Sequence, residues 1–244
     1  MITDICTIIW KELLELLYLR GRMRSGRISL LILVGILGIF MPLQSGRDWF
    51  NTPLPVLFYG LLPFTLVSSV IADSFAGERE RHTLETLLAS RLADTAILYG
   101  KIIAAQIFGW GLTMLCAVLG VIAINLVYAQ GNLQFFPPIV TFGIVASSLL
   151  VSGFVSGLGV IISLRSTTVR QAQQTFSIAF FAMFIPIFAL PLLPEAWNMR
   201  ATEVMEKLDF VSLGIAVVAI LLVVDIGLLI AARLHFRRER LILD

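Results

Sequence analysis

Six long apolar runs determine what this chain can fold into. Each is close to the roughly 20 residues that an α-helix needs to cross the hydrocarbon core of a bilayer. A backbone in lipid must satisfy its own hydrogen bonds, and these runs do not alternate apolar and polar residues as barrel strands do. They therefore predict helices, with the expected spans at residues 28–43, 53–75, 102–127, 138–164, 175–193 and 210–232.

The composition supports a membrane protein rather than a soluble domain. Apolar residues make up 58% of the chain and charged residues only 14%, and the mean hydropathy is +0.94. These values lie far outside the range of soluble proteins. We expect an all-α membrane protein with one transmembrane domain over residues 1–244.

Lysine and arginine are unevenly distributed between the two sides of the predicted membrane domain. With both termini inside, the outer segments hold only Arg47, Arg200 and Lys207 of the 18 Lys and Arg residues. Cytoplasmic segments near spans are enriched in these residues, so we expect both termini in the cytoplasm of a protein in the inner or plasma membrane. The basic clusters then act as anchors to anionic lipid, and no aromatic-interleaved basic surface indicates nucleic-acid binding.

Residues 1–27 precede the first span and have the pattern of an amphipathic helix at the membrane interface. Apolar residues share one face at helical spacing, namely Ile5, Ile9, Leu13, Leu16 and Leu17. Charged residues lie off that face, namely Lys11, Glu12 and Glu15. The pattern is that of a helix that either only lies on the membrane surface or also packs against the charged segment 77–101 and a cytoplasmic partner.

The chain carries no motif for catalysis, metal binding or nucleotide binding. Its two histidines, His82 and His235, and its two cysteines, Cys6 and Cys116, lack the spacing of a metal site. A phosphate-binding loop is absent as well, because Lys101 is followed by an isoleucine and no glycine precedes it at the required distance. The sequence therefore predicts neither an enzyme nor a bound cofactor.

Two features within the spans could have structural or transport roles. Asp225 is the one carboxylate well inside a span, where it is predicted either to bond a neighbouring helix or to line a substrate path. The fourth span carries serines at every fourth position, Ser148, Ser152 and Ser156, and a G-x-x-x-G at Gly153 and Gly157. Small residues at this spacing favour close helix packing, within the subunit or across a dimer interface.

The charged segment 77–101, GERERHTLETLLASRLADTAILYGK, separates the second and third spans. After a turn at Gly77, the pattern predicts a helix from Glu78 that carries leucines on one face, followed by a break at residues 90–93. Asp94 is then expected to cap a second short helix that leads through Lys101 into the third span. An ordered protrusion of this kind suits contact with a cytoplasmic partner.

This segment resembles the first cytoplasmic loop of type-2 ABC exporter permeases, which has the form G-E-[RK]-E-x-x-T-L-E-x-L-L. The matching residues are Gly77, Glu78, Arg79, Glu80, Thr83, Leu84, Glu85, Leu87 and Leu88, followed by Gly100 and Lys101. The N-terminal IWKELLELLYLRGRM is similar to the connecting helix of that family. One departure is that many members have a proline near Arg91, where this chain reads Ser90-Arg91-Leu92.

The resemblance implies a permease subunit that forms a homo- or heterodimer and is driven by two cytoplasmic ATPase subunits, which bind ATP-Mg. In that reading Glu78, Glu80 and Glu85 hold the loop against the connecting helix, and the elbow from Ser90 through Arg91 to Asp94 contacts the ATPase. Transport would alternate the exposure of the dimer interface, in the direction of export.

Other functional classes remain open from the residues alone. A secondary carrier would transport without ATP, although ion coupling normally needs a relay or a coordination cluster rather than one carboxylate. A membrane-embedded enzyme would need a catalytic cluster, and an assembly or sensor subunit could use the same loop only to bind a partner. The sequence does not select a substrate.

Overall fold

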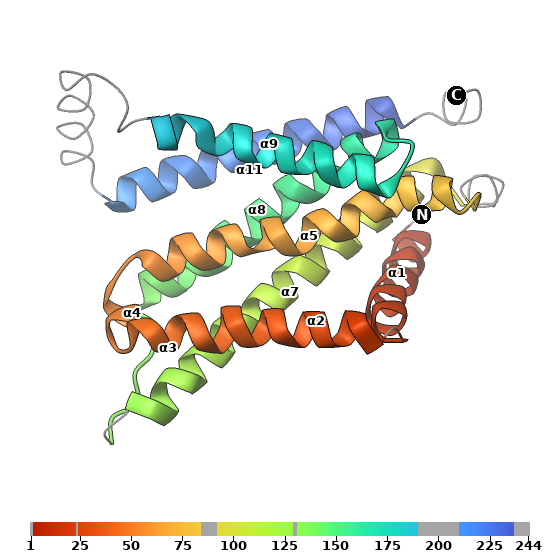
Figure 1. Cartoon of the computed structure of the whole chain (residues 1–244). Helices are drawn as coiled ribbons and strands as arrows, with labels where there is room; N and C mark the ends of the chain where they lie inside the picture. The colour runs from red at the N-terminus through yellow and green to blue at the C-terminus, as the bar shows by residue number, and fades with distance from the viewer. Residues whose placement is uncertain (1, 23, 84–91, 129–130, 190–209, 237–244) are drawn as a thin grey trace.

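The computed structural model describes residues 2–22, 24–83, 92–128, 131–189 and 210–236. Helices dominate these residues, and no strand occurs among them (Figure 1). The helices are α1 (Ile2–Arg22), α2 (Arg24–Gly35), the π-helical turn η1 (Ile36–Phe40), α3 (Met41–Ser45), α4 (Asp48–Asn51), α5 (Leu54–Glu80), α7 (Asp94–Tyr128), α8 (Pro138–Arg165), α9 (Val169–Ala189) and α11 (Phe210–His235).

Five helical segments are long and apolar enough to cross a membrane. They are Ile28–Ser45, which runs through α2, η1 and α3, then Leu54–Glu80, Asp94–Tyr128, Pro138–Arg165 and Ser212–Leu234. Each overlaps a predicted span, although Leu54–Glu80 and Asp94–Tyr128 extend beyond the predicted ranges on the side of segment 77–101. The all-helical fold and the multi-pass character are therefore confirmed.

The fifth predicted span, residues 175–193, is described only in part. Its described residues lie in α9, and residues 190–193 fall outside the described ranges. The first turns of α9 are polar, with Arg170, Gln171, Gln173 and Gln174, and α9 is not among the five spans found in the described residues. A membrane crossing at residues 175–193, and with it the total of six spans, stays a prediction.

Helices α5, α7 and α8 form the centre of the bundle, since each packs against the other two. The rod of α2, η1 and α3 crosses α7 and contacts it through η1 and α3, while α9 lies against α5 and α8, and α11 lies against α8 (Figure 1). Helix α1 runs across one end of the bundle, where it packs on α7 (Figure 1). This end, where α5 finishes and α7 begins, brings the N-terminal helix to the charged segment.

Small residues on α8 let its neighbours come close. A Cβ atom on Gly159 would lie 2.2 Å from Ile71 of α5, and one on Gly157 would lie 3.1 Å from Leu228 of α11. The buried Ser163 hydroxyl donates to the Ala72 carbonyl of α5 at 3.0 Å. The predicted close packing of the fourth span is therefore confirmed, and the observed contacts are within one chain.

We expect Gly159→Ala to destabilise the protein, because the added methyl group overlaps Ile71 and also lies 2.8 Å from the ring of Phe176. Overpacking of this kind costs about 1 to 3 kcal/mol. The matched control is Gly111→Ala on α7, where nothing lies within 4 Å of the new methyl group. Thermal unfolding in detergent should separate the two variants, and equal midpoints would contradict the packing described for α8.

Candidate functional site

The end of α5 and the start of α7 bring most of the described motif residues together. Residues 78–81 finish α5, and Gly100 and Lys101 lie two turns into α7. Each of the four residues from Glu78 to Arg81 contacts a different partner, on α7, α8, α9 or α5 itself. We define the coupling cluster as these four residues together with Glu12, Asp73 and Lys101.

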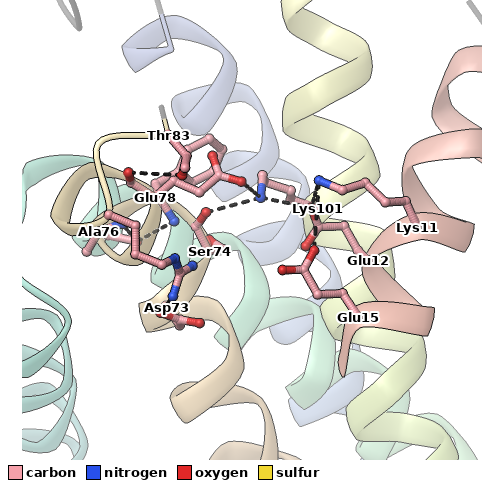
Figure 2. Close-up of polar contacts among 12 residues, drawn as sticks. Lys11, Glu12, Glu15, Asp73, Ser74, Ala76, Glu78, Thr83 and Lys101 are labelled. Atoms are coloured by element: carbon pink, nitrogen blue, oxygen red, sulfur yellow. Dashed lines mark hydrogen bonds and ion pairs between the residues drawn. The ribbon is translucent and has the colours of Figure 1, made fainter. Parts of the chain in front are cut away.

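Lys101 is the centre of the coupling cluster (Figure 2). Its Nζ donates to Glu78 Oε1 at 2.8 Å, to Glu12 Oε1 at 3.0 Å and to the Ser74 carbonyl at 3.1 Å. The Lys101 side chain is only 2% exposed, against 16% for Glu12 and 12% for Glu78. All three ammonium protons can thus be used, and one buried cation joins α1, α5 and α7.

Buried ammonium groups are costly unless they are paired and hydrogen-bonded. In the coupling cluster, two carboxylates and one carbonyl replace the water that Lys101 loses, and the Phe75 ring lies 5.4 Å from Nζ. The other carboxylate oxygen of Glu78 is buried and has no hydrogen-bond partner among the described residues. The geometry is that of a three-helix junction held by one cation.

Arg79 and Glu80 contact the connection between α8 and α9. The Arg79 guanidinium donates to the carbonyls of Leu164 and Ser166, at the C-terminal end of α8. The Glu80 carboxylate accepts from the amide N–H of Val169, the first residue of α9. A cation at a helix C-terminus and an anion at a helix N-terminus both interact favourably with the helix dipole.

Arg81 turns back along α5 and pairs with Asp73 at 3.2 Å, with both side chains about half exposed. Gly77 lies beneath this pair, because a Cβ atom there would be 1.9 Å from the Asp73 carboxylate. The prediction that Gly77 forms a turn is wrong, since it is buried inside α5. Its lack of a side chain makes room for the ion pair.

Gly100 provides the corresponding close approach on α7. A Cβ atom at Gly100 would lie 2.6 Å from the Ile8 side chain of α1, and Ile8 is buried. The predicted packing of the N-terminal helix beside segment 77–101 is therefore observed, although its placement at a membrane interface stays a prediction. The buried residue is Ile8, which was not assigned to the apolar face, whereas Ile9 is only half-buried.

The chain leaves α5 in a sharp turn. His82 has a positive φ of 56°, and the Thr83 N–H and hydroxyl both donate to the Glu78 carbonyl. The prediction that one helix begins at Glu78 and continues through the leucines of the segment is therefore wrong, because α5 ends at Glu80. The remaining predicted loop residues, Leu84, Glu85, Leu88, Ser90 and Arg91, lie outside the described ranges.

Asp94 begins α7, which continues without a break to Tyr128. The first backbone bonds of this helix go to the Ala93 carbonyl, from the N–H groups of Ala96 and Ile97. The predicted short helix before the third span is therefore the first part of α7 itself. Asp94 lies in its first turn, where a carboxylate favours the helix dipole.

Asp225 lies apart from the coupling cluster, between α11, α8 and α7. A Cβ atom on Gly153 would be 2.9 Å from the Asp225 carboxylate and 3.1 Å from the Gln106 amide nitrogen, so Gly153 leaves room for both polar groups. The other Asp225 oxygen is buried without a hydrogen-bond partner in the described part of the chain. Asp225 thus faces two neighbouring helices, and its role in packing or in a substrate path stays a prediction.

Several partners in the coupling cluster were missed by sequence reasoning. Glu12 was placed off the packing face of the N-terminal helix, yet it lies one turn after the buried Ile8 and so faces the same way. The carbonyls of Ser74, Leu164 and Ser166 carry no side-chain signal. The signal for Lys101 was its position before a long apolar run, where an unpaired charge is costly.

A comparison with known protein families identifies the family of this chain. The family described as ABC-2 family transporter protein matches residues 55–226, which is more than half of the 244 residues. The chain belongs to this transporter family. The matched range holds α5, α7, α8 and Asp225, whereas Glu12 lies before it.

A curated relative is also similar. The ABC transporter permease protein NatB of Bacillus subtilis (strain 168) is 23% identical over an alignment of 144 positions, which covers 54% of this chain. The match covers 37% of that relative, so it spans well under half of the relative's length.

We expect Lys101→Met to destabilise the protein by about 3 to 5 kcal/mol, because the largely buried carboxylates of Glu12 and Glu78 lose this short ion pair. The matched control is Lys11→Met on α1, since Lys11 is 57% exposed and its carboxylates are 3.8 Å away, and exposed pairs contribute at most about 1 kcal/mol. Thermal unfolding in detergent provides the measurement.

A second substitution tests the origin of this loss. Adding Glu78→Gln to Lys101→Met removes one of the two carboxylate charges that Lys101 neutralises, and should recover part of the lost stability. An unfolding midpoint of Lys101→Met equal to that of Lys11→Met would contradict a central role for Lys101.

Proposed function

We propose that this chain is the permease subunit of an ATP-binding-cassette exporter, and that segment 77–101 receives the movement of a cytoplasmic ATPase. The observation that carries the proposal is the coupling cluster, in which the end of α5 is bonded to α7, α8 and α9 and, through Lys101, is linked to α1. A loop that only reconnects two spans does not need its base fixed to four other helices.

The proposed assembly contains two permease subunits, identical or different, and two ATPase subunits that bind ATP-Mg. In this proposal ATP hydrolysis takes place in the partner subunits rather than in this chain. The ATPase would contact Ser90, Arg91 and Asp94, while the segment with Leu84, Glu85 and Leu88 would transmit its movement to the coupling cluster. Closure of the ATPases would then alternate the exposure of the interface between the permeases.

The rigidity of the cluster supports this role. Transmission over tens of ångströms requires elements that move as units rather than deform locally. The ion pairs of Lys101 are buried and short, so a displacement of the end of α5 would also displace α1 and the start of α7. Through Arg79 and Glu80, the same displacement would reach α8 and α9.

The proposed orientation has both termini and segment 77–101 in the cytoplasm, as the distribution of lysine and arginine favours. In a background without Cys6 and Cys116, single cysteines at Gly46 and Asn132 should react with a membrane-impermeant maleimide added to intact cells. Cysteines at Ser90 and Arg170 should react only after the cells are opened. Reversed labelling would remove the basis for an ATPase contact at this segment.

Function is tested by co-expressing the chain with a cassette ATPase from the same genome, then measuring co-purification, ATP hydrolysis and efflux. We expect Glu85→Ala and Leu88→Asp to leave the assembly intact but to lower permease-dependent ATP hydrolysis by roughly 2- to 30-fold, since mutations along coupling networks change coupling by about 0.5 to 2 kcal/mol. Substitutions at Arg91 or Asp94 should mainly reduce co-purification of the ATPase.

Leu133→Asp is the matched control for Leu88→Asp. It makes the same chemical change at an exposed leucine in the connection between α7 and α8, at the other end of α7. It should leave ATP hydrolysis unchanged. Transport by the chain without any ATPase would instead favour a secondary carrier, and ATPase binding without transport would favour an assembly subunit.

A further inference from the structure

Tyr99 belongs to the aliphatic-Tyr-Gly-Lys motif, but it takes no part in the coupling cluster. An α-helix turns about 100° per residue, so Tyr99 and Lys101 point about 200° apart around α7. Tyr99 faces α11 instead, where it lines a groove of about 410 Å³. The other lining residues all lie on α11 and are Ile226, Leu229, Ile230, Arg233 and Leu234.

The groove is apolar along its length and cationic near one end. Ile226, Ile230 and Leu234 are more than half exposed on the surface of α11, while Tyr99 and Leu229 pack on the main core. Arg233 is the next-to-last residue of the candidate span Ser212–Leu234. Among the described residues, Arg233 forms no hydrogen bond or ion pair.

This arrangement matches the chemistry of a membrane phospholipid. Arginine binds phosphate through charge-assisted hydrogen bonds, and tyrosine is favoured at membrane interfaces because its ring is apolar and its hydroxyl is polar. The aliphatic side chains extend from Arg233 into the candidate span, in the direction that an acyl chain would take. A soluble anion would use only the arginine and would leave the aliphatic surface uncovered.

We propose that the groove between α7 and α11 binds one anionic phospholipid, with its phosphate on Arg233 and Tyr99 and an acyl chain along Ile226 and Ile230. The bound lipid would lie against the first turns of α7, the helix that carries Lys101. It would therefore restrain α7 on the side facing away from the coupling cluster. Lipid binding here does not depend on the transport assignment.

The test uses the purified full chain in nanodiscs of equal phosphatidylglycerol and phosphatidylcholine. After detergent extraction, mass spectrometry counts the lipids that remain bound. We expect wild type to retain phosphatidylglycerol in preference, and Arg233→Gln to lower that preference roughly fivefold, because one arginine near an anionic surface contributes about 1 kcal/mol. Tyr99→Phe should lower it by less.

Two further variants separate the groove from general surface charge. Arg170→Gln is the matched control, because Arg170 borders a hollow in which the polar Gln173, Gln174 and Ser177 separate it along α9 from the apolar Ile178 and Phe181. This variant should retain phosphatidylglycerol as wild type does. Ile230→Trp fills the groove without changing charge and should reduce retention. The proposal would be overturned if Arg170→Gln lost as much phosphatidylglycerol as Arg233→Gln, or if Ile230→Trp retained as much as wild type.

A second copy of the chain is the alternative occupant. A single cysteine at Leu234, in a background without Cys6 and Cys116, reports on it. Efficient disulfide-linked dimers in isolated native membranes treated with the oxidant copper phenanthroline would show that a second copy covers the groove, and this outcome would also overturn the lipid proposal. Monomeric migration together with loss of phosphatidylglycerol in Arg233→Gln is the expected result.

Discussion

The structure depends first on the cost of burying one ammonium group. Lys101 lies on a helix that continues directly into an apolar span, and its side chain is almost fully removed from solvent. A charge in this position needs partners on several sides, and Glu12, Glu78 and the Ser74 carbonyl provide them. The electrostatic requirement of one side chain therefore fixes the mutual positions of α1, α5 and α7 at one end of the bundle.

Close packing of the helix backbones allows the buried Lys101 ammonium group to reach partners on other helices. A carboxylate reaches Lys101 from α1 only if α1 approaches α7 closely, and Gly100 allows that approach at Ile8. Gly159 and Ser163 do the same for α5 and α8, so that Arg79 reaches the end of α8. Lipid provides little hydrophobic force between helices, so van der Waals packing and polar bonds of this kind must hold the bundle together.

The sequence predicted the helical spans well because apolar runs of fixed length have few alternatives in a bilayer. It also located the charged segment and the close packing of α8. It failed at Gly77 and at the end of α5, because a glycine followed by charges has the pattern of a turn. The helix continues there, and its end makes a tertiary contact between Glu78 and Lys101 of α7. The role of Glu12 was missed for a similar reason, since its partner lies 89 positions away.

The neighbouring residues Arg79 and Glu80 give the connection between α8 and α9 a polarity. A guanidinium meets the carbonyls that finish one helix, and a carboxylate meets an amide that begins the next. If the two residues were exchanged, each helix end would face a charge of the wrong sign, although composition and net charge would be unchanged. The order of Arg79 and Glu80, and not only their presence, therefore affects the structure. A sequence with Glu-Arg at these positions would need a different connection between α8 and α9.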